Sequence, residues 1–140
     1  MMEITANAIQ LVNIGENVQF TDTVVPSKGC VAHRPGSGLI TLRGITNQCR
    51  ARFKVSFGAN IAVPTGGTPD AISLALSISG EPIDTTTMIV TPAAVDEYFN
   101  VFSSIYLDVP RGCCYTVSVR NTSDQEINVQ NANLIVERIA

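Results

Sequence analysis

The sequence predicts an all-β sandwich of about eight to ten antiparallel strands, with a turn roughly every ten residues. Its 140 residues include fifteen Val, fourteen Ile and thirteen Thr, and these β-branched types suit a pleated surface. Apolar and polar residues alternate in several segments, as expected for strands with one face in a core. The length fits one domain with a real core and is too short for two.

Alternation is clearest over residues 49–57, where apolar side chains occupy the odd positions and polar ones the even positions. The same period of two marks residues 72–79, 101–109 and 115–120. We therefore expect a strand in each of these segments, with one face buried.

Turn residues separate these segments at 35–38, 64–70, 79–82 and 110–112, where Pro presets the first corner and Gly supplies a positive φ. The only helical candidate is Thr91–Tyr98, which has Thr as a cap, Pro in the first turn and two early acids. We expect at most one short helical turn there.

Two strands carry apolar residues on both faces. Phe102 and Tyr106 lie opposite the core set of their strand, and Ile135 and Ile139 lie opposite the core set of the last strand. A small β domain without helices needs another subunit to cover such a second face. We expect a homo-oligomer with these four residues in its interface.

Charged residues make up only 15% of the chain, against about 25% in an average domain. This composition excludes a disordered tail and a coiled coil. The net charge of −3 gives no general attraction to phosphate and excludes a nucleic-acid-coating protein. Residues 1–5 do not resemble a signal peptide, and no apolar run approaches the length of a membrane span. We expect a soluble chain, made in the cytoplasm, with no membrane partner.

A positive stripe is formed by Arg50, Arg52 and Lys54, which share one face of a predicted strand. Nucleic-acid binding is one interpretation, although the interleaved aromatic residues that stack bases are missing. A solvated outer face is favoured instead, or an ion-pairing face towards a neighbouring subunit or an acidic capsid.

The four cysteines, Cys30, Cys49, Cys113 and Cys114, show no C-x-x-C spacing. Cys49 continues an inward-facing alternation, so we expect a buried free thiol. Cys113 and Cys114 are adjacent in the sequence, so their side chains would point to opposite faces, one buried and the other exposed. A disulfide, including one between subunits, requires oxidising surroundings. Cys30 with His33 would supply half of a metal site, but no second pair completes it.

Catalytic motifs are missing. His33 is the only histidine, which excludes HExxH, and neither G-x-S-x-G nor a P-loop occurs. Asp96 and Glu97 are neighbours rather than a pair across a cleft, and the chain has no Trp to stack a sugar. Turn acids such as Asp70 and Asp124 lack EF-hand spacing. We expect no enzymatic activity, no cofactor and no bound metal.

The order of these segments resembles the tumour-necrosis-factor/complement-globular-head jelly roll, in its bacterial and bacteriophage form. The resemblance covers the chain from about residue 17 onward and consists of strand-and-turn patterns rather than catalytic signatures. It is carried by residues 36–42, 50–57, 71–82, 86–88, 106–112, 117–121 and 134–136.

This resemblance implies a ten-stranded sandwich that assembles as a threefold trimer, with apolar sheet faces meeting at the axis. No Gly-X-Y stalk precedes the knob, so residues 17–140 would be the jelly roll and residues 1–16 an arm or extra strand. The function it implies is structural or adhesive, with a bacteriophage virion component favoured, either decorating the capsid or tipping a short fibre. The alternatives are a knob on a bacterial cell or spore surface, and a glycan- or receptor-binding module that uses loops such as 64–70 and 84–88.

Overall fold

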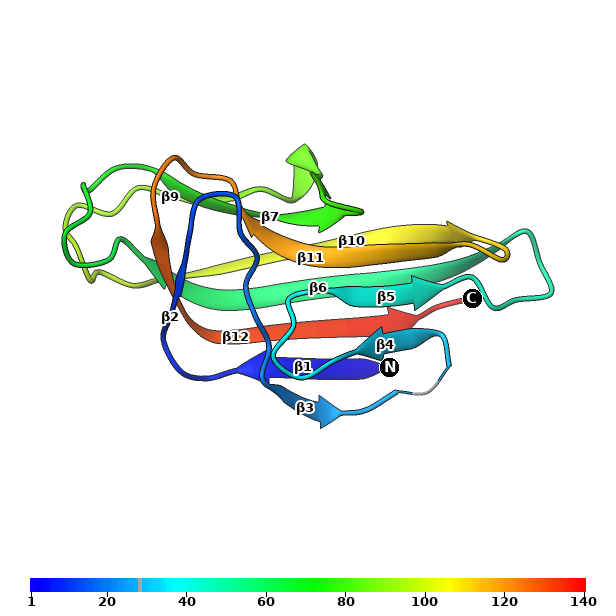
Figure 1. The fold of residues 1–140 in the computed structure, drawn as a ribbon. Coiled ribbons are helices and arrows are strands. Elements are labelled where there is room, and N and C mark those ends of the chain that lie inside the picture. The colour runs from blue at the N-terminus through cyan, green and yellow to red at the C-terminus, as the bar shows by residue number, and fades with distance from the viewer. Residues whose placement is uncertain (28) are drawn as a thin grey trace.

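A computed structural model describes residues 1–27 and 29–140 and shows two antiparallel sheets with the core between them (Figure 1). Sheet 1 has the order β10 (Phe99–Pro110), β6 (Arg50–Ala62), β12 (Ile127–Arg138), β1 (Met2–Ala6) and β3 (Asp22–Val25), with β2 (Gln10–Val12) also paired to β12. Sheet 2 has the order β4 (Val31–His33), β5 (Ile40–Arg43), β11 (Cys114–Asn121), β7 (Ile72–Ile78) and β8 (Glu81–Pro82), with β9 (Met88–Val90) paired to β7.

The all-β jelly-roll prediction is therefore confirmed, with more short strands than the sequence suggests. Twelve strands form within the described residues, and the two- and three-residue strands among them include β2, β8 and β9. Such short strands carry too few alternating residues to be recognised in the sequence. None of the helices in the described residues is long and apolar enough to span a membrane.

The core follows the alternation of the long strands. The odd positions of β6 from Ala51 to Ile61 are all buried, and Phe53 and Phe57 are fully so. The ring of Phe57 meets that of Phe20 edge to face at 6.3 Å, and Phe20 lies in the connection between β2 and β3. Burying a phenylalanine contributes about 1.5–3 kcal/mol, so these three rings anchor sheet 1 to the core.

The N-terminal residues are part of sheet 1. Strand β1 pairs with β12 from Met2 opposite Val136 to Ala6 opposite Ala132, and β3 pairs with the other edge of β1. Strand β2 extends the pairing at the opposite end of β12. Residues 2–6 therefore form a strand of sheet 1 between β12 and β3.

The helical turn lies elsewhere than expected. The 3-10 turn of the described residues spans Asp84–Thr86, whereas Thr91–Tyr98 contains bends and one turn. Asp96 has a φ of 57°, outside the right-handed helical region, and its N–H donates to the carbonyl of Val63 at 2.8 Å. This contact with the loop after β6 replaces the local bond that a helix would need, so the segment forms bends and a single turn, within the expected limit of one short helical turn.

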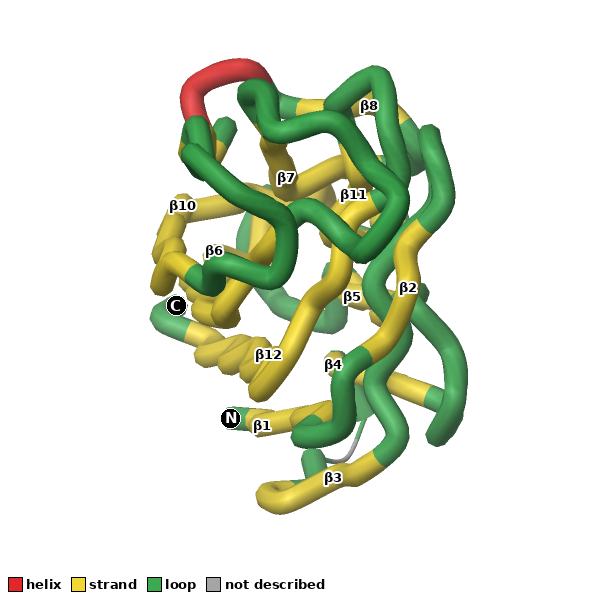
Figure 2. The backbone as a smooth tube through the Cα atoms, turned by 90° about the vertical axis from the view of Figure 1, so that its left-hand side faces the viewer, coloured by secondary structure: helices red, strands yellow, loops and turns green. Residues whose placement is uncertain are grey.

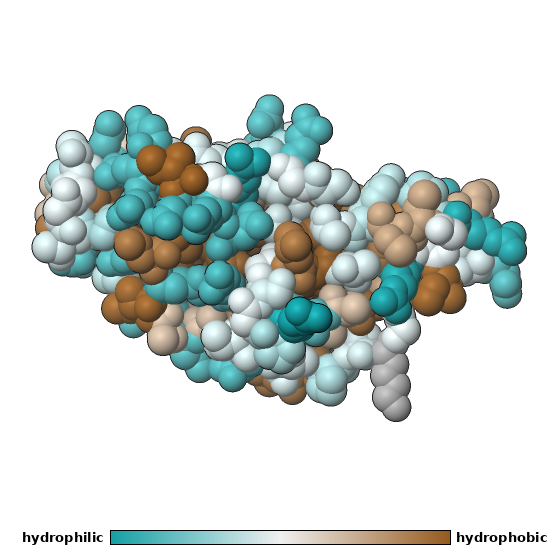
Figure 3. Space-filling model, in the orientation of Figure 1, coloured by the Kyte–Doolittle hydropathy of each residue, from teal (hydrophilic) through white to brown (hydrophobic). Residues whose placement is uncertain are grey.

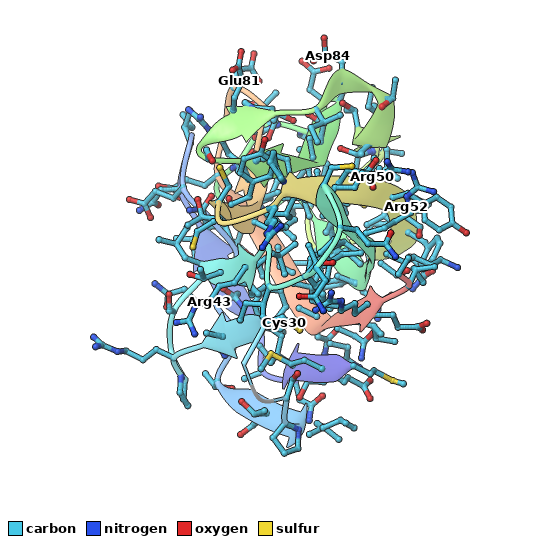
Figure 4. The ribbon with its side chains drawn as sticks, turned by 90° about the vertical axis from the view of Figure 1, so that its right-hand side faces the viewer. Cys30, Arg43, Arg50, Arg52, Glu81 and Asp84 are labelled. Carbon is cyan, nitrogen blue, oxygen red and sulfur yellow. The ribbon has the colours of Figure 1, made fainter. Side chains whose placement is uncertain are left out.

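The long strands β6, β10 and β12 run along the molecule, so the connecting loops gather at its two ends (Figure 1). Figure 2 looks onto one end, where loops drawn in green face the viewer. Figure 4 looks onto the other end, near the start of β6. The flat faces of the sheets lie between these ends.

Candidate interaction face of sheet 1

The outward face of β10, β6 and β12 is the candidate functional site, because it gathers most of the residues singled out in the sequence. Phe102 lies opposite Gly58 and Tyr106 opposite Lys54 on the β10–β6 ladder. On the other side of β6, Ile135 lies opposite Ser56. Ile139 follows β12, and its N–H donates to the carbonyl of Arg52 at 2.7 Å. The four candidate interface residues thus share one sheet face.

Two aromatic side chains stand out of this face. Phe102 and Tyr106 are each 66% exposed, and Ile139 is 49% exposed, while Ile135 is half-buried. A hollow of about 320 Å³ lies between Tyr106, Ile139 and the Arg52–Asp108 pair. Figure 3 shows another aspect of the surface, where apolar residues occur as separate patches among polar ones.

Small and internally bonded polar residues fill the space between the apolar side chains. The hydroxyls of Ser56 and Ser104 share a hydrogen bond of 3.0 Å across β6 and β10. Gly58 lies beside Phe102, and a Cβ placed on it would make an ordinary van der Waals contact with that ring at 3.7 Å. A face of this kind offers aromatic anchors with few unsatisfied polar groups around them, which is typical of the centre of a protein interface.

The basic stripe lies on the same face and is compensated by its own sheet. Arg52 binds both carboxylate oxygens of Asp108, with Nε at 2.8 Å from Oδ1 and one terminal nitrogen at 3.1 Å from Oδ2. The Nε of Arg50 lies 3.0 Å from Oδ2 of the same carboxylate. The Nζ of Lys54 lies 5.9 Å from the centre of the Tyr106 ring, a cation–π distance.

These contacts shift both members of the central ion pair. The hydrogen bond from Arg52 is the main cause that lowers the pKa of Asp108, and attraction to Arg52 and Arg50 adds to it. The same hydrogen bond raises the pKa of Arg52. Both side chains are partly exposed, so solvent screens the pair, and its contribution to stability is small.

The cysteines lie elsewhere than the alternation predicts. Cys49 is exposed, contrary to the expected buried thiol, because it precedes the first residue of β6, where the sandwich ends. Cys113 and Cys114 are both exposed, and Cys30 is half-buried. All four are free thiols.

The candidate histidine is structural in this arrangement. The Nε2 of His33, at the end of β4, lies 2.9 Å from the carbonyl oxygen of Ser37, and its ring meets Phe20 edge to face at 6.3 Å. Within residues 1–27 and 29–140, no three His, Cys, Asp or Glu side chains come together as a metal-ion site.

Asn121 is the structural residue that the sequence does not reveal. It is 1% exposed, and its side-chain nitrogen donates to the carbonyls of Val12, Asn13 and Gln125 at 3.1, 3.3 and 2.9 Å. Its side-chain oxygen accepts a hydrogen bond from the N–H of Ser123 at 3.0 Å. The sequence marks this residue only as the start of an Asn-Thr-Ser sequon, whereas its amide clamps two loops together.

Comparison with known proteins agrees with this architecture. No family model matches the chain, and no curated protein matches it in sequence. Three solved structures align over nearly all of the chain. Eiger TNF from S. frugiperda has a TM-score of 0.70 at 13% identity, covering 99% of this chain and 91% of its own. Murine APRIL has a TM-score of 0.65 at 9% identity, covering 97% and 98%. The globular domain of zebrafish complement 1qA has a TM-score of 0.61 at 12% identity, covering 96% and 94%.

Likeness at such low identity concerns the fold alone. The alignments assign the same fold as the two antiparallel sheets and their strand order. The chain has the jelly-roll fold of tumour necrosis factor and complement globular domains.

Proposed function

We propose that this chain is a non-enzymatic structural or binding module that acts as a homotrimer, with the outward face of sheet 1 buried between subunits. The observation that supports this most directly is the exposure of Phe102 and Tyr106, at 66% each, on a face where Arg50 and Arg52 already contact Asp108 of the same sheet. Removing such rings from water is favourable, and no charge has to be stripped of its partner to do so.

The composition agrees with an assembly. Only 15% of the residues are charged, and a monomer with so few charges and an exposed aromatic face would be poorly soluble. In a threefold ring each copy buries this face once, and the closed symmetry leaves no face uncovered. The threefold number comes from the jelly-roll resemblance noted in the sequence.

The solution mass tests the trimer directly. Light scattering on a sizing column, in about 0.5 M salt to screen weak ionic contacts, should give three times the 14.9 kDa chain mass. Phe102→Asp should shift the mass to that of one chain, because three desolvated carboxylates would face the axis. The variant should still fold, because the side chain at position 102 lies mostly outside the core.

Ile89→Asp is the matched control. Ile89 is 63% exposed, close to the value for Phe102, but lies in β9 on sheet 2. This variant should keep the wild-type mass. A wild-type monomer, or equal dissociation by both substitutions, would overturn the assignment of the interface to sheet 1.

We further place this trimer in a bacteriophage virion, as a capsid decoration or a short fibre knob. The support is the resemblance to the bacteriophage form of the jelly roll. Mass spectrometry of purified virions should find the chain in a fixed ratio to the capsid protein. Recovery from a bacterial cell or spore surface with none in the virions would overturn this placement in favour of the surface-knob alternative.

A further inference from the structure

Half of the twelve acidic residues gather in loops at one end of the molecule. Four loops at one end carry six carboxylates and no Lys or Arg: residues 13–16, 63–71, 91–98 and 122–126. All six carboxylate residues are exposed. We call this the acidic end, and its acids are Glu16, Asp70, Asp96, Glu97, Asp124 and Glu126.

Hydrogen bonds between the loops hold the acidic end together. The hydroxyl of Thr65 donates to Asp96 at 2.7 Å. The side chain of Gln125 joins Thr68 twice, accepting from its N–H at 3.3 Å and donating to its carbonyl at 2.9 Å. Asn121 ties the 13–16 and 122–126 loops to each other. The carboxylates are therefore presented on a cross-linked surface, which reduces the entropy lost on binding.

The opposite end is rich in arginine. Figure 4 looks onto it and labels Arg43, Arg50 and Arg52. Arg111 lies in the turn after β10 and Arg138 at the end of β12, and both are exposed, as are Arg43 and Arg50, whereas Arg52 is half-buried. Asp108 neutralises only one of the two arginines that it contacts. We call Arg43, Arg111 and Arg138 the basic end, because Arg50 and Arg52 belong to the outward face of sheet 1.

The ends are far enough apart to present opposite charge independently. Strand β6 has 13 residues and runs from Arg50, near the basic end, to Ala62 beside the acidic loops. At a rise of about 3.3 Å per residue, the strand spans about 40 Å. Charges are screened over about 10 Å in 0.1 M salt. A neighbouring molecule therefore meets one end without sensing the other.

Each end also offers a hollow with one exposed isoleucine. At the acidic end a hollow of about 430 Å³ includes Ile14, which is 59% exposed. At the basic end a hollow of about 510 Å³ includes Ile45, which is 55% exposed. Opposite charge surrounds an apolar side chain on both surfaces, so each can bury apolar area against the other while pairing charges.

We propose that copies of this protein associate end to end, with the acidic end of one copy seated on the basic end of the next. The contact joins two different surfaces, so it repeats and builds an open stack rather than a closed ring. It uses the loops at the strand ends and leaves the outward face of sheet 1 free. The stack and the trimer are therefore separate properties of the chain.

Sedimentation velocity at two salt concentrations tests this proposal. In about 0.02 M salt, the weight-average mass should rise at least twofold above its value in about 0.5 M salt, because only the ionic contact is strongly screened. The Asp124→Lys/Glu126→Lys variant should abolish this rise. The control is Glu81→Lys/Asp84→Lys, which makes the same change in net charge at exposed positions in β8 and the 3-10 turn, and it should keep the rise.

Mixing complementary variants tests the head-to-tail arrangement. Arg43→Glu/Arg111→Glu should also fail to stack, because its basic end has become acidic. Mixed with Asp124→Lys/Glu126→Lys, it should regain at least half of the wild-type mass increase, because each variant supplies an end that the other lacks. Circular dichroism of each variant confirms that it is folded.

Three results would overturn the proposal: a mass independent of salt, an equal loss of mass in the Glu81/Asp84 control, or no recovery on mixing. The mass in about 0.5 M salt reports the trimer separately. A stack that grows in steps of one chain would disprove the trimer alone, and a trimer with no growth would disprove the stack alone.

Discussion

Replacing Asn121 by alanine tests whether one buried amide holds the loops of the acidic end. The substitution removes the donor to the carbonyls of Val12, Asn13 and Gln125, and the acceptor for the N–H of Ser123. The Val12 bond is buried, and the others are partly buried. A buried group left without a partner costs about 1–3 kcal/mol, and a partly buried one that water can reach costs less. We therefore expect a loss of about 2–4 kcal/mol in the free energy of unfolding.

Urea unfolding followed by circular dichroism measures this loss. Variant and wild type must be compared at one chain concentration, because assembly adds to apparent stability. Asn13→Ala is the control: Asn13 lies in one of the two loops that Asn121 joins, its side chain is exposed, and its amide makes only a 3.4 Å contact with Glu16. It should change stability by less than about 0.5 kcal/mol. A loss below about 1 kcal/mol for Asn121→Ala would show that water replaces the amide and would refute the clamp.

Three further predictions follow from single contacts. The pKa of Asp108, measured by carboxyl NMR titration, should lie below its ordinary value and rise towards it in Arg52→Ala, and an unchanged pKa in the variant would contradict this cause. Because the folded pKa is lowered, the contribution of Asp108 to stability is present above about pH 4 and disappears as the pH falls through the folded value. Gly44→Ala should prevent stable folding, because its Cβ would lie 2.1 Å from the carbonyl oxygen of Pro110. Gly58→Ala, whose Cβ would lie 3.7 Å from its nearest atoms, should fold with a normal circular dichroism spectrum. Two equally stable variants would show that the backbone at Gly44 moves to accept the side chain. Three thiols, Cys49, Cys113 and Cys114, should react rapidly with Ellman's reagent in the native protein, and Cys30 more slowly because it is half-buried; four equal rates would contradict the burial of Cys30.

Much of the fold could be predicted because burial acts on each strand residue separately. In β6 and β10 every second residue faces the core, so the alternation itself states which side chains point inward. The exposure of Phe102 and Tyr106 follows from the same rule. The alternation failed at Cys49, because a period of two does not show where the opposite sheet stops covering the strand. It also missed β2, β8 and β9, which are too short to show a period.

The contacts between distant strands could not be predicted in this way. The sequence places Arg50, Arg52 and Lys54 on one face, but only the β10–β6 register sets Asp108 opposite Arg52 and Tyr106 opposite Lys54. A charged stripe is thereby changed into a compensated face. Likewise, the six carboxylates of the acidic end are scattered between residues 16 and 126 and meet only because their loops close the same end of the sandwich.

The sequence by itself thus determined an all-β sandwich, the inward and outward side of each long strand, and the presence of aromatic residues on an outward face. Only the tertiary structure decided that these residues share one sheet face, that the arginines beside them are paired, and that Asn121 joins two loops. The physical reason is that side-chain orientation depends on the local period of the backbone. The neighbours of a side chain depend on strand pairing between residues some 40 to 130 positions apart, as in the Asn100–Asn60 and Asn133–Glu3 contacts.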